Sequence, residues 1–236
     1  MSMDERYIEK RRSIEKFFAP ENKIDDSKKI ITSPNGNFQL EYHRYSTGPK
    51  TWNYSRGTVT RVSNSDIIAD IKRNYGHFWH RWLTHPNGNE YLLCGEDYQG
   101  YSVVNLTTGK YHVYFPEEGY KGGGFCWTAV YPSPDGLVLA VDGCYWACPY
   151  DLVFYDFREP EKLPFSEIAR FDNLDTCEGW LDNETFVLSQ EVEFRKSDGL
   201  AYKILSEEEQ NILDTDSSLV DYRKETFYFK RPPFQE

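Results

Sequence analysis

The chain has 236 residues, of which 39% are hydrophobic, 28% charged and 17% aromatic, and its formal net charge is −11. This negative charge argues against nucleic acid as a partner, because phosphate backbones are bound by dense basic surfaces. The length and composition are those of a folded chain, not a disordered one. The high aromatic fraction favours β-structure, since flat side chains pack well on pleated sheets.

The cysteines and the apolar runs indicate the compartment. Five cysteines are scattered at positions 94, 126, 144, 148 and 177, and an odd, scattered set is typical of reduced thiols in the cytosol. The first residues, Met1 to Arg6, lack the apolar stretch of a secretory signal, and no apolar run approaches the roughly 20 residues of a membrane span. We therefore expect a cytoplasmic protein with no membrane partner; the sequence gives no indication of the oligomeric state.

The first 30 residues differ from the rest. Between Asp4 and Phe18, apolar side chains recur at near-helical spacing among charged ones, and Ala19-Pro20 supplies a stop. This pattern predicts a short amphipathic helix in an N-terminal extension, residues 1–30. The helix either docks a partner or packs over one end of the main domain, residues 31–236, and the second interpretation is favoured.

A turn signal recurs through the main domain. Its copies are Ser33-Pro34-Asn35-Gly36, His85-Pro86-Asn87-Gly88, Ser133-Pro134-Asp135-Gly136 and a degraded Leu181-Asp182-Asn183-Glu184, roughly every 50 residues. Proline fixes φ early in the turn, and glycine tolerates the positive φ that ends it, so each copy should start a strand. About four strands per repeat of this length is typical of a propeller blade.

Alternating apolar residues place the strands of each repeat. The predicted strands are 38–42, 57–62 and 67–71; 91–94, 101–106 and 111–115; 137–141, 152–157 and 168–171; and 186–189, 192–195 and 200–205. Further strands are expected at 78–83, 126–131 and 224–230, and a short helix after Ser206.

These repeats resemble the blades of β-propellers of the WD-repeat and TolB-like kinds. The resemblance rests on Ser133 to Val141, on His85 to Cys94, on Val103 to Lys110 and on Trp180 to Thr185. It covers roughly residues 30–206. It implies an all-β, small propeller-like domain of four to five blades with a short N-terminal helix. It implies no function, because propellers serve as scaffolds, binding platforms and enzymes alike.

Three short motifs suggest chemistry that their context argues against. His77 and His80 lie three apart on a predicted strand and would point to opposite faces, so they are not expected to share a metal. Cys144 and Cys148 form only half of a zinc site or a disulfide pair. The glycines at 122–124 lead into a strand instead of the helix of a phosphate loop. We expect no metal and no cofactor.

The loops between the first and second strands of each repeat vary most in length, and such insertions often mark the binding face of repeat proteins. They are rich in aromatic and acidic residues. The predicted partner-binding residues are Trp52, Tyr54, Glu96, Asp97, Tyr98, Asp142, Tyr145 and Trp146. The alternative is that these aromatic side chains only pack on one another across a small central channel.

Two functions follow as hypotheses. The first is a non-catalytic binding or scaffold protein that engages a protein or peptide, with Glu96, Asp97 and Asp142 favouring basic groups. The second is a hydrolase or lyase that acts on a sugar or small metabolite with paired acids such as Asp97 and Asp142. The sequence identifies no catalytic residue with certainty, so whether the protein is an enzyme stays open at this point.

Overall fold

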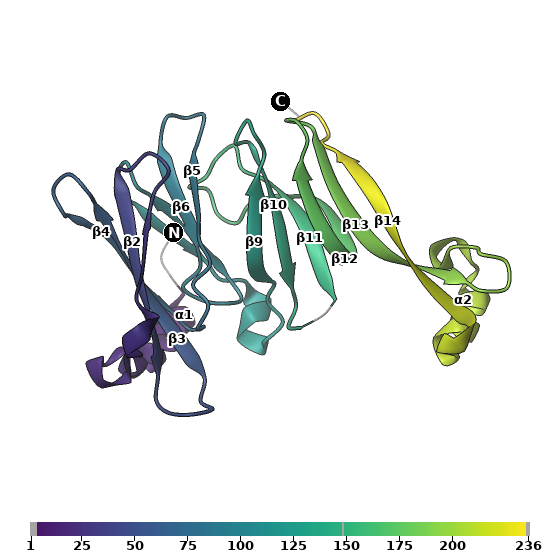
Figure 1. Cartoon of the computed structure of the whole chain (residues 1–236), viewed down its shortest axis with the longest axis horizontal. Coiled ribbons are helices and arrows are strands. Elements are labelled where there is room, and N and C mark those ends of the chain that lie inside the picture. The colour runs from purple at the N-terminus through teal and green to yellow at the C-terminus, as the bar shows by residue number, and fades with distance from the viewer. Residues whose placement is uncertain (1–3, 148, 235–236) are drawn as a thin grey trace.

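The computed structural model describes residues 4–147 and 149–234. The architecture is mostly β with a short N-terminal helix, as predicted: three antiparallel sheets stand in a row (Figure 1), and the two α-helices are α1 (Glu5–Ile14) and α2 (Glu207–Thr215). The first sheet contains β1 (Lys29–Thr32), β2 (Phe38–Ser46), β3 (Asn53–Arg61) and β4 (Ile67–Arg73). The second contains β5 (Arg81–Thr84), β6 (Glu90–Cys94), β7 (Tyr101–Asn105) and β8 (Tyr111–Tyr114). The third contains β9 (Cys126–Pro132), β10 (Val138–Cys144), β11 (Tyr150–Asp156), β12 (Glu167–Trp180), β13 (Thr185–Arg195) and β14 (Val220–Lys230).

The first two sheets have the strand order of a propeller blade. Their strands pair strictly in chain order, β1 to β4 and β5 to β8, each antiparallel to the next. The predicted resemblance to β-propeller repeats is confirmed at this level, because four strands meander outward in each sheet.

The recurring turn starts a strand as predicted. In the first copy the Gly36 N–H donates to the Ser33 carbonyl at 2.9 Å, and the Phe38 N–H donates to Ser33 Oγ at 3.0 Å. Gly36 has a φ of +79°, which favours glycine. In the degraded copy Asp182 takes over, since its carboxylate accepts from the N–H groups of Glu184 and Thr185 at 2.8 and 2.6 Å.

The fourth repeat differs from the prediction. Segments 186–189 and 192–195 form the single strand β13, because no glycine or proline interrupts the alternation between them. Segment 200–205 is not a strand but contains a one-turn helix, Tyr202–Ile204. β12 serves two repeats, since its part before Leu174 pairs with β11 and its part after Leu174 pairs with β13. The third and fourth repeats therefore share one sheet.

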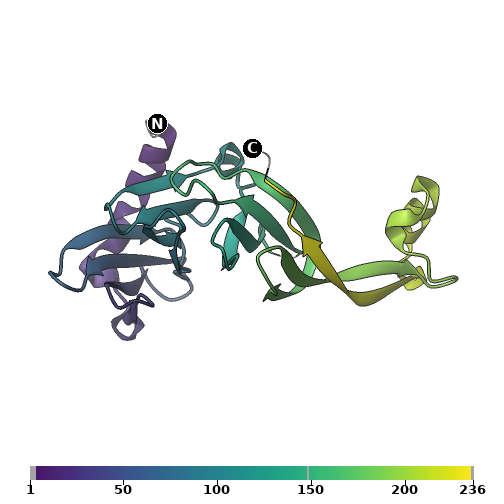
Figure 2. The same ribbon diagram turned by 90° about the horizontal axis from the view of Figure 1, so that it is seen from above.

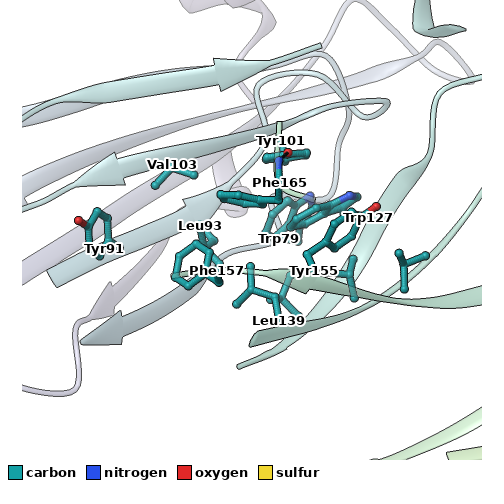
Figure 3. Close-up of a cluster of buried hydrophobic side chains, with 13 residues drawn as sticks. Trp79, Tyr91, Leu93, Tyr101, Val103, Trp127, Leu139, Tyr155, Phe157 and Phe165 are labelled. Atoms are coloured by element: carbon teal, nitrogen blue, oxygen red, sulfur yellow. Dashed lines mark hydrogen bonds between the residues drawn. The ribbon is translucent and has the colours of Figure 1, made fainter. Parts of the chain in front are cut away.

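Three apolar clusters hold successive layers together. The first cluster joins β2, β3 and β4 to β6 and β7. The second cluster joins the second sheet to β9, β10 and β11. The third cluster lies inside the third sheet, between β10 and β11 on one side and β13 and β14 on the other. Figure 3 shows the second cluster, in which the Trp127 ring stacks on Tyr101 with centroids 4.3 Å apart. Stacked aromatics of this kind hold large apolar areas in fixed geometry.

The segment before β5 was predicted as a strand from residue 78, but the strand begins at Arg81. The alternation of its side chains nevertheless holds. Phe78 belongs to the first cluster and Trp79 to the second, so consecutive residues face different neighbouring sheets.

The N-terminal helix packs over one end of the first two sheets, which confirms the favoured interpretation. The Tyr7 hydroxyl donates to Glu96 at 2.7 Å, and Arg11 donates to the Glu96 carbonyl at 2.8 Å. Beyond the helix, Phe18 contacts the Tyr45 ring edge-on at 5.4 Å. These contacts tie residues far apart in the chain.

At the other end of the row, β13 and β14 narrow into a ribbon that carries α2 away from the sheets (Figures 1 and 2). The predicted helix after Ser206 is confirmed. Ser206 and Glu209 form a reciprocal capping box. A small cluster of Leu205, Leu213 and Val220 anchors the helix to the ribbon.

Candidate functional site

Four aromatic side chains meet at one end of the sheets; we call Trp52, Tyr75, Tyr98 and Trp146 the aromatic tetrad. Trp52, Tyr98 and Trp146 come from the β2–β3, β6–β7 and β10–β11 loops, and Tyr75 comes from the β4–β5 connection. Their loops belong to three different sheets, so the packing of the sheets, and not the local sequence, assembles this surface.

The tetrad is a connected set of ring contacts. The Trp52 ring stacks on Trp146 at 6.0 Å and meets Tyr75 edge-on at 5.4 Å. Tyr98 lies 6.0 Å from Trp52, 5.7 Å from Trp146 and 6.1 Å from Tyr75. Of the predicted loop aromatics, Trp52, Tyr98 and Trp146 thus pack on one another, and Tyr75 joins them.

The tetrad nevertheless stays open to solvent. Trp52 is 42% exposed, Tyr75 is 40% exposed and Trp146 is 58% exposed. Trp146 and the following Ala147 adopt φ values of +95° and +67°, a region that costs a residue with a side chain about 1 kcal/mol or more. Strained backbone that holds a large ring in water is typical of functional surfaces.

A buried polar layer supports the tetrad from below. Asn74 is central: its carbonyl accepts from Trp52 Nε1 at 2.7 Å, its amide donates to Asp97 at 2.7 Å, and its side-chain oxygen accepts from the Tyr98 N–H at 2.9 Å. Asp97 is 2% exposed and also accepts from the Gln99 N–H at 3.0 Å. These bonds fix the two loops that carry Trp52 and Tyr98.

Arg73 closes the layer. It is 2% exposed and donates to the carbonyls of His77, Gly95 and Asp97 at 2.8, 2.6 and 3.1 Å. Burial lowers the pKa of Arg73 to about 10. A charged guanidinium shared by three carbonyls holds the first and second sheets in register at this end.

The acidic residues predicted at the binding face are placed inside the protein or away from the tetrad. Glu96 accepts from Tyr7 and Tyr111 at 2.7 and 2.9 Å, and Asp97 belongs to the buried layer. Asp142 lies on β10 on the same face as Ala140, which faces the fourth repeat. These carboxylates therefore lie inside the protein or between repeats and do not contact the tetrad rings as an acidic binding face.

Two predicted aromatic residues lie elsewhere. Tyr54 belongs to β3, not to a loop, and stacks on Phe17 of the N-terminal segment at 4.4 Å. Tyr145 turns away from Trp146 and contacts Phe125 at 5.3 Å. The loop between the predicted strands 38–42 and 57–62 is shorter than expected, because β2 and β3 extend into it as a regular hairpin.

Tyr75 was missed by the sequence reasoning, which considered only loops between first and second strands. The signal in the sequence was an aromatic residue within the polar run Asn74-Tyr75-Gly76-His77, directly after a predicted strand. Such a run is a loop, and an aromatic in it needs a neighbour to cover its ring.

Two cavities involve the tetrad or its chain neighbours. The first, about 580 Å³, is lined by Trp52 and Tyr75 together with Lys29, Arg44 and His77. The second, about 470 Å³, is lined by Gln99 and Tyr145, the chain neighbours of Tyr98 and Trp146, and by aromatic residues between the second and third sheets. Trp52 and Tyr75 thus border the first cavity directly, whereas the second cavity is lined by chain neighbours of the tetrad and not by the tetrad itself.

Within residues 4–147 and 149–234, no group of three or more His, Cys, Asp or Glu side chains could hold a metal. Cys94, Cys126, Cys144 and Cys177 are free, and Cys148 lies outside the described residues. Burial raises the pKa of the Cys126 thiol to about 11, so this thiol is not activated as a nucleophile. Of the helices that the structure describes, none has the length and apolar composition to cross a membrane.

The chain is similar to an uncharacterized protein of Acanthamoeba polyphaga mimivirus. The two are 41% identical over 146 residues, which is 62% of this chain and 57% of the viral protein. The chain thus matches little more than half the length of that relative. No protein-family model matches the chain.

Solved structures similar to this one include β-propeller domains. The propeller domain of the Trilobed protease from Pyrococcus furiosus has a TM-score of 0.43 at 11% identity, covering 71% of this chain and 50% of that one. The β-propeller domain of Myceliophteria thermophila Cps50 (Swd1) has a TM-score of 0.43 at 14% identity, covering 80% and 53%. Kuenenia stuttgartiensis hydrazine synthase has a TM-score of 0.41 at 12% identity, covering 90% and 66%. These likenesses concern the fold alone.

Proposed function

We propose that this protein is a non-catalytic binding module that engages a protein or peptide through the aromatic tetrad. The observation that carries the proposal is the exposure of three of its rings, which are between 40% and 58% open to solvent while a buried polar layer fixes their loops. Exposed aromatic clusters on rigid supports are typical of interaction surfaces, because Trp and Tyr bury much area on binding and lose little conformational entropy.

The two cavities favour an extended partner. A peptide that crosses the tetrad would place side chains in the hollow beside Trp52 and in the hollow beside Tyr145. Aromatic-lined grooves bind extended segments in this way. The expectation of a basic partner gains no support from Glu96 and Asp97, which are engaged inside the protein.

We propose that the scaffold that supports the tetrad consists of four blade units. The support is the set of three apolar clusters between successive layers, with β12 shared by the third and fourth units. Closure into a ring is not needed for the tetrad, since its four rings come from the first three units.

The alternative, a hydrolase or lyase with paired acids, would need two carboxylates facing one hollow. Asp97 is 2% exposed, and Asp142 faces the packing between the third and fourth repeats. Neither residue lines either of the cavities beside the tetrad. The predicted pair therefore does not support catalysis. Glu118 and Glu167 do line the second cavity, but we favour binding because the exposed tetrad rings favour an interaction surface.

The test is a selection from a random peptide library on the immobilised protein, followed by calorimetry with single variants. Peptides bound by the tetrad should lose at least about tenfold in affinity with Trp52→Ala or Trp146→Ala, since a buried aromatic anchor contributes about 2 kcal/mol or more. The matched control is Tyr228→Ala, an aromatic residue 64% exposed on β14. Peptides that bind all three variants as tightly as the wild type would overturn the proposal, as would the absence of any selected peptide.

A further inference from the structure

The first cavity, which Trp52 and Tyr75 line, also carries two basic side chains. Lys29 on β1 and Arg44 on β2 are both exposed and both line it. The Lys29 ammonium lies over the Tyr42 ring at 5.9 Å. Among the described residues, neither cation has a carboxylate within ion-pair distance, although acidic residues outnumber basic ones 38 to 27 in the chain.

The remaining lining residues leave this cavity positive. Asp26 is the single carboxylate of the lining residues. Burial, with Arg73 and Lys29 nearby, lowers the pKa of His77 below 6.5, so His77 is neutral at pH 7. Two cations against one carboxylate give a net positive hollow on a strongly negative protein, and a hollow of one sign focuses the local field on ligands of the other.

We propose that this cavity binds a carboxylate of the partner peptide, next to an aromatic residue that packs on Trp52 and Tyr75. The inference rests on the proposed function and adds the chemistry of one end of the ligand. Arg44 can hold a carboxylate with two parallel N–H donors, and Lys29 adds a point charge. The carboxylate is either the peptide's C-terminus or an acidic side chain.

Four short probes separate these sources. N-acetyl-phenylalanine has a terminal carboxylate, and N-acetyl-aspartyl-phenylalaninamide has one on a side chain. N-acetyl-phenylalaninamide and N-acetyl-asparaginyl-phenylalaninamide are their neutral counterparts. Binding is followed by ¹⁹F NMR of protein labelled with 5-fluorotryptophan, with the Trp52 signal assigned from Trp52→Phe.

We expect at least one acidic probe to bind about two- to fivefold more tightly than its neutral counterpart, the size of effect that partly exposed ion pairs give. The difference should disappear in Lys29→Gln/Arg44→Gln and shrink in high salt. It should grow in Asp26→Asn. Lys121→Gln, which removes one positive charge at an exposed site outside the lining of this cavity, should leave the difference unchanged.

Equal binding of acidic and neutral probes would overturn the carboxylate inference while leaving the tetrad as a binding surface. An acid preference that survives the double variant would also overturn it, because the charge would then come from elsewhere. If no probe shifts the Trp52 signal while library peptides bind in a Trp52-dependent way, the carboxylate inference alone fails. If library peptides also fail to bind, the proposed function fails with it.

Discussion

The indole of Trp146 lies nearly parallel to that of Trp52, with ring centroids 6.0 Å apart and planes at 17°. Trp146 is carried by a loop of the third sheet and Trp52 by a loop of the first sheet, so this contact spans the second sheet. Because neither ring is buried, their stacking depends on rigid loops and not on a surrounding core.

Trp146 offers a direct test of backbone strain. Its φ of +95° suits glycine better than any residue with a Cβ. We expect Trp146→Gly to be more stable to urea than Trp146→Ala by about 1 kcal/mol, although both variants lack the ring. Equal stabilities would show that the loop relaxes to negative φ when the indole is removed.

Gly57 on β3 is required by close packing. A Cβ at this position would lie 2.5 Å from Phe78 Cζ and 2.9 Å from Leu40 Cδ1. Gly57→Ala should therefore destabilise the protein by about 1–3 kcal/mol, the usual cost of overpacking. Gly123→Ala is the control, because its nearest neighbour would be 3.7 Å away; urea unfolding of this variant should match the wild type.

The carboxyl group of Asp142 should make the stability of the protein depend on pH. Burial raises its pKa to about 6, and within the described structure its Oδ1 has no hydrogen-bond partner. The folded state thus binds the proton more tightly than the unfolded state, so this group's contribution to stability increases as the pH falls from about 6 toward 3.8. Asp142→Asn should raise the Tm at pH 7.5, and its advantage should shrink at pH 5.

Asp182 supplies the control of opposite sign. The N–H groups of Glu184 and Thr185 lower the pKa of its carboxyl, so the charged form stabilises the fold above the unfolded pKa. Asp182→Ala should lower the Tm at pH 7.5, with a smaller loss at acid pH.

A Tm for Asp142→Asn that differs from the wild type equally at pH 7.5 and pH 5 would contradict the pKa assigned to Asp142.

The ribbon that carries α2 should unfold on its own when its small cluster is weakened. Leu213 is 3% exposed, whereas the adjacent Ile212 is 55% exposed. Leu213→Ala should cost about 2–3 kcal/mol locally and raise hydrogen exchange over residues 200–222, while exchange in β6 and β7 stays unchanged. Ile212→Ala should leave both regions protected; increased exchange throughout the chain would instead show one cooperative unit.

Local signals in the sequence were enough to predict much of the scaffold. The turns at Ser33, His85 and Ser133 start strands because proline, glycine and a side-chain oxygen act within a few residues. The short helix after Ser206 was also predicted, and the structure shows that a capping box of Ser206 and Glu209 starts it within the same few residues. Alternation of apolar residues placed most strands within a few residues, and even assigned Phe78 and Trp79 to opposite sides where the backbone is not a strand.

The sequence by itself determined the repeat, most of the strands and the aromatic character of the loops, since these depend on neighbours along the chain. Only the tertiary structure decided which rings meet, because Trp52, Tyr75, Tyr98 and Trp146 are brought together by the packing of three sheets. It also decided that Glu96 and Asp97 are internal, since a carboxylate in a loop carries no local mark of the donors that will surround it. The binding surface is therefore a consequence of how the layers stack, and the repeat is what makes that stacking regular.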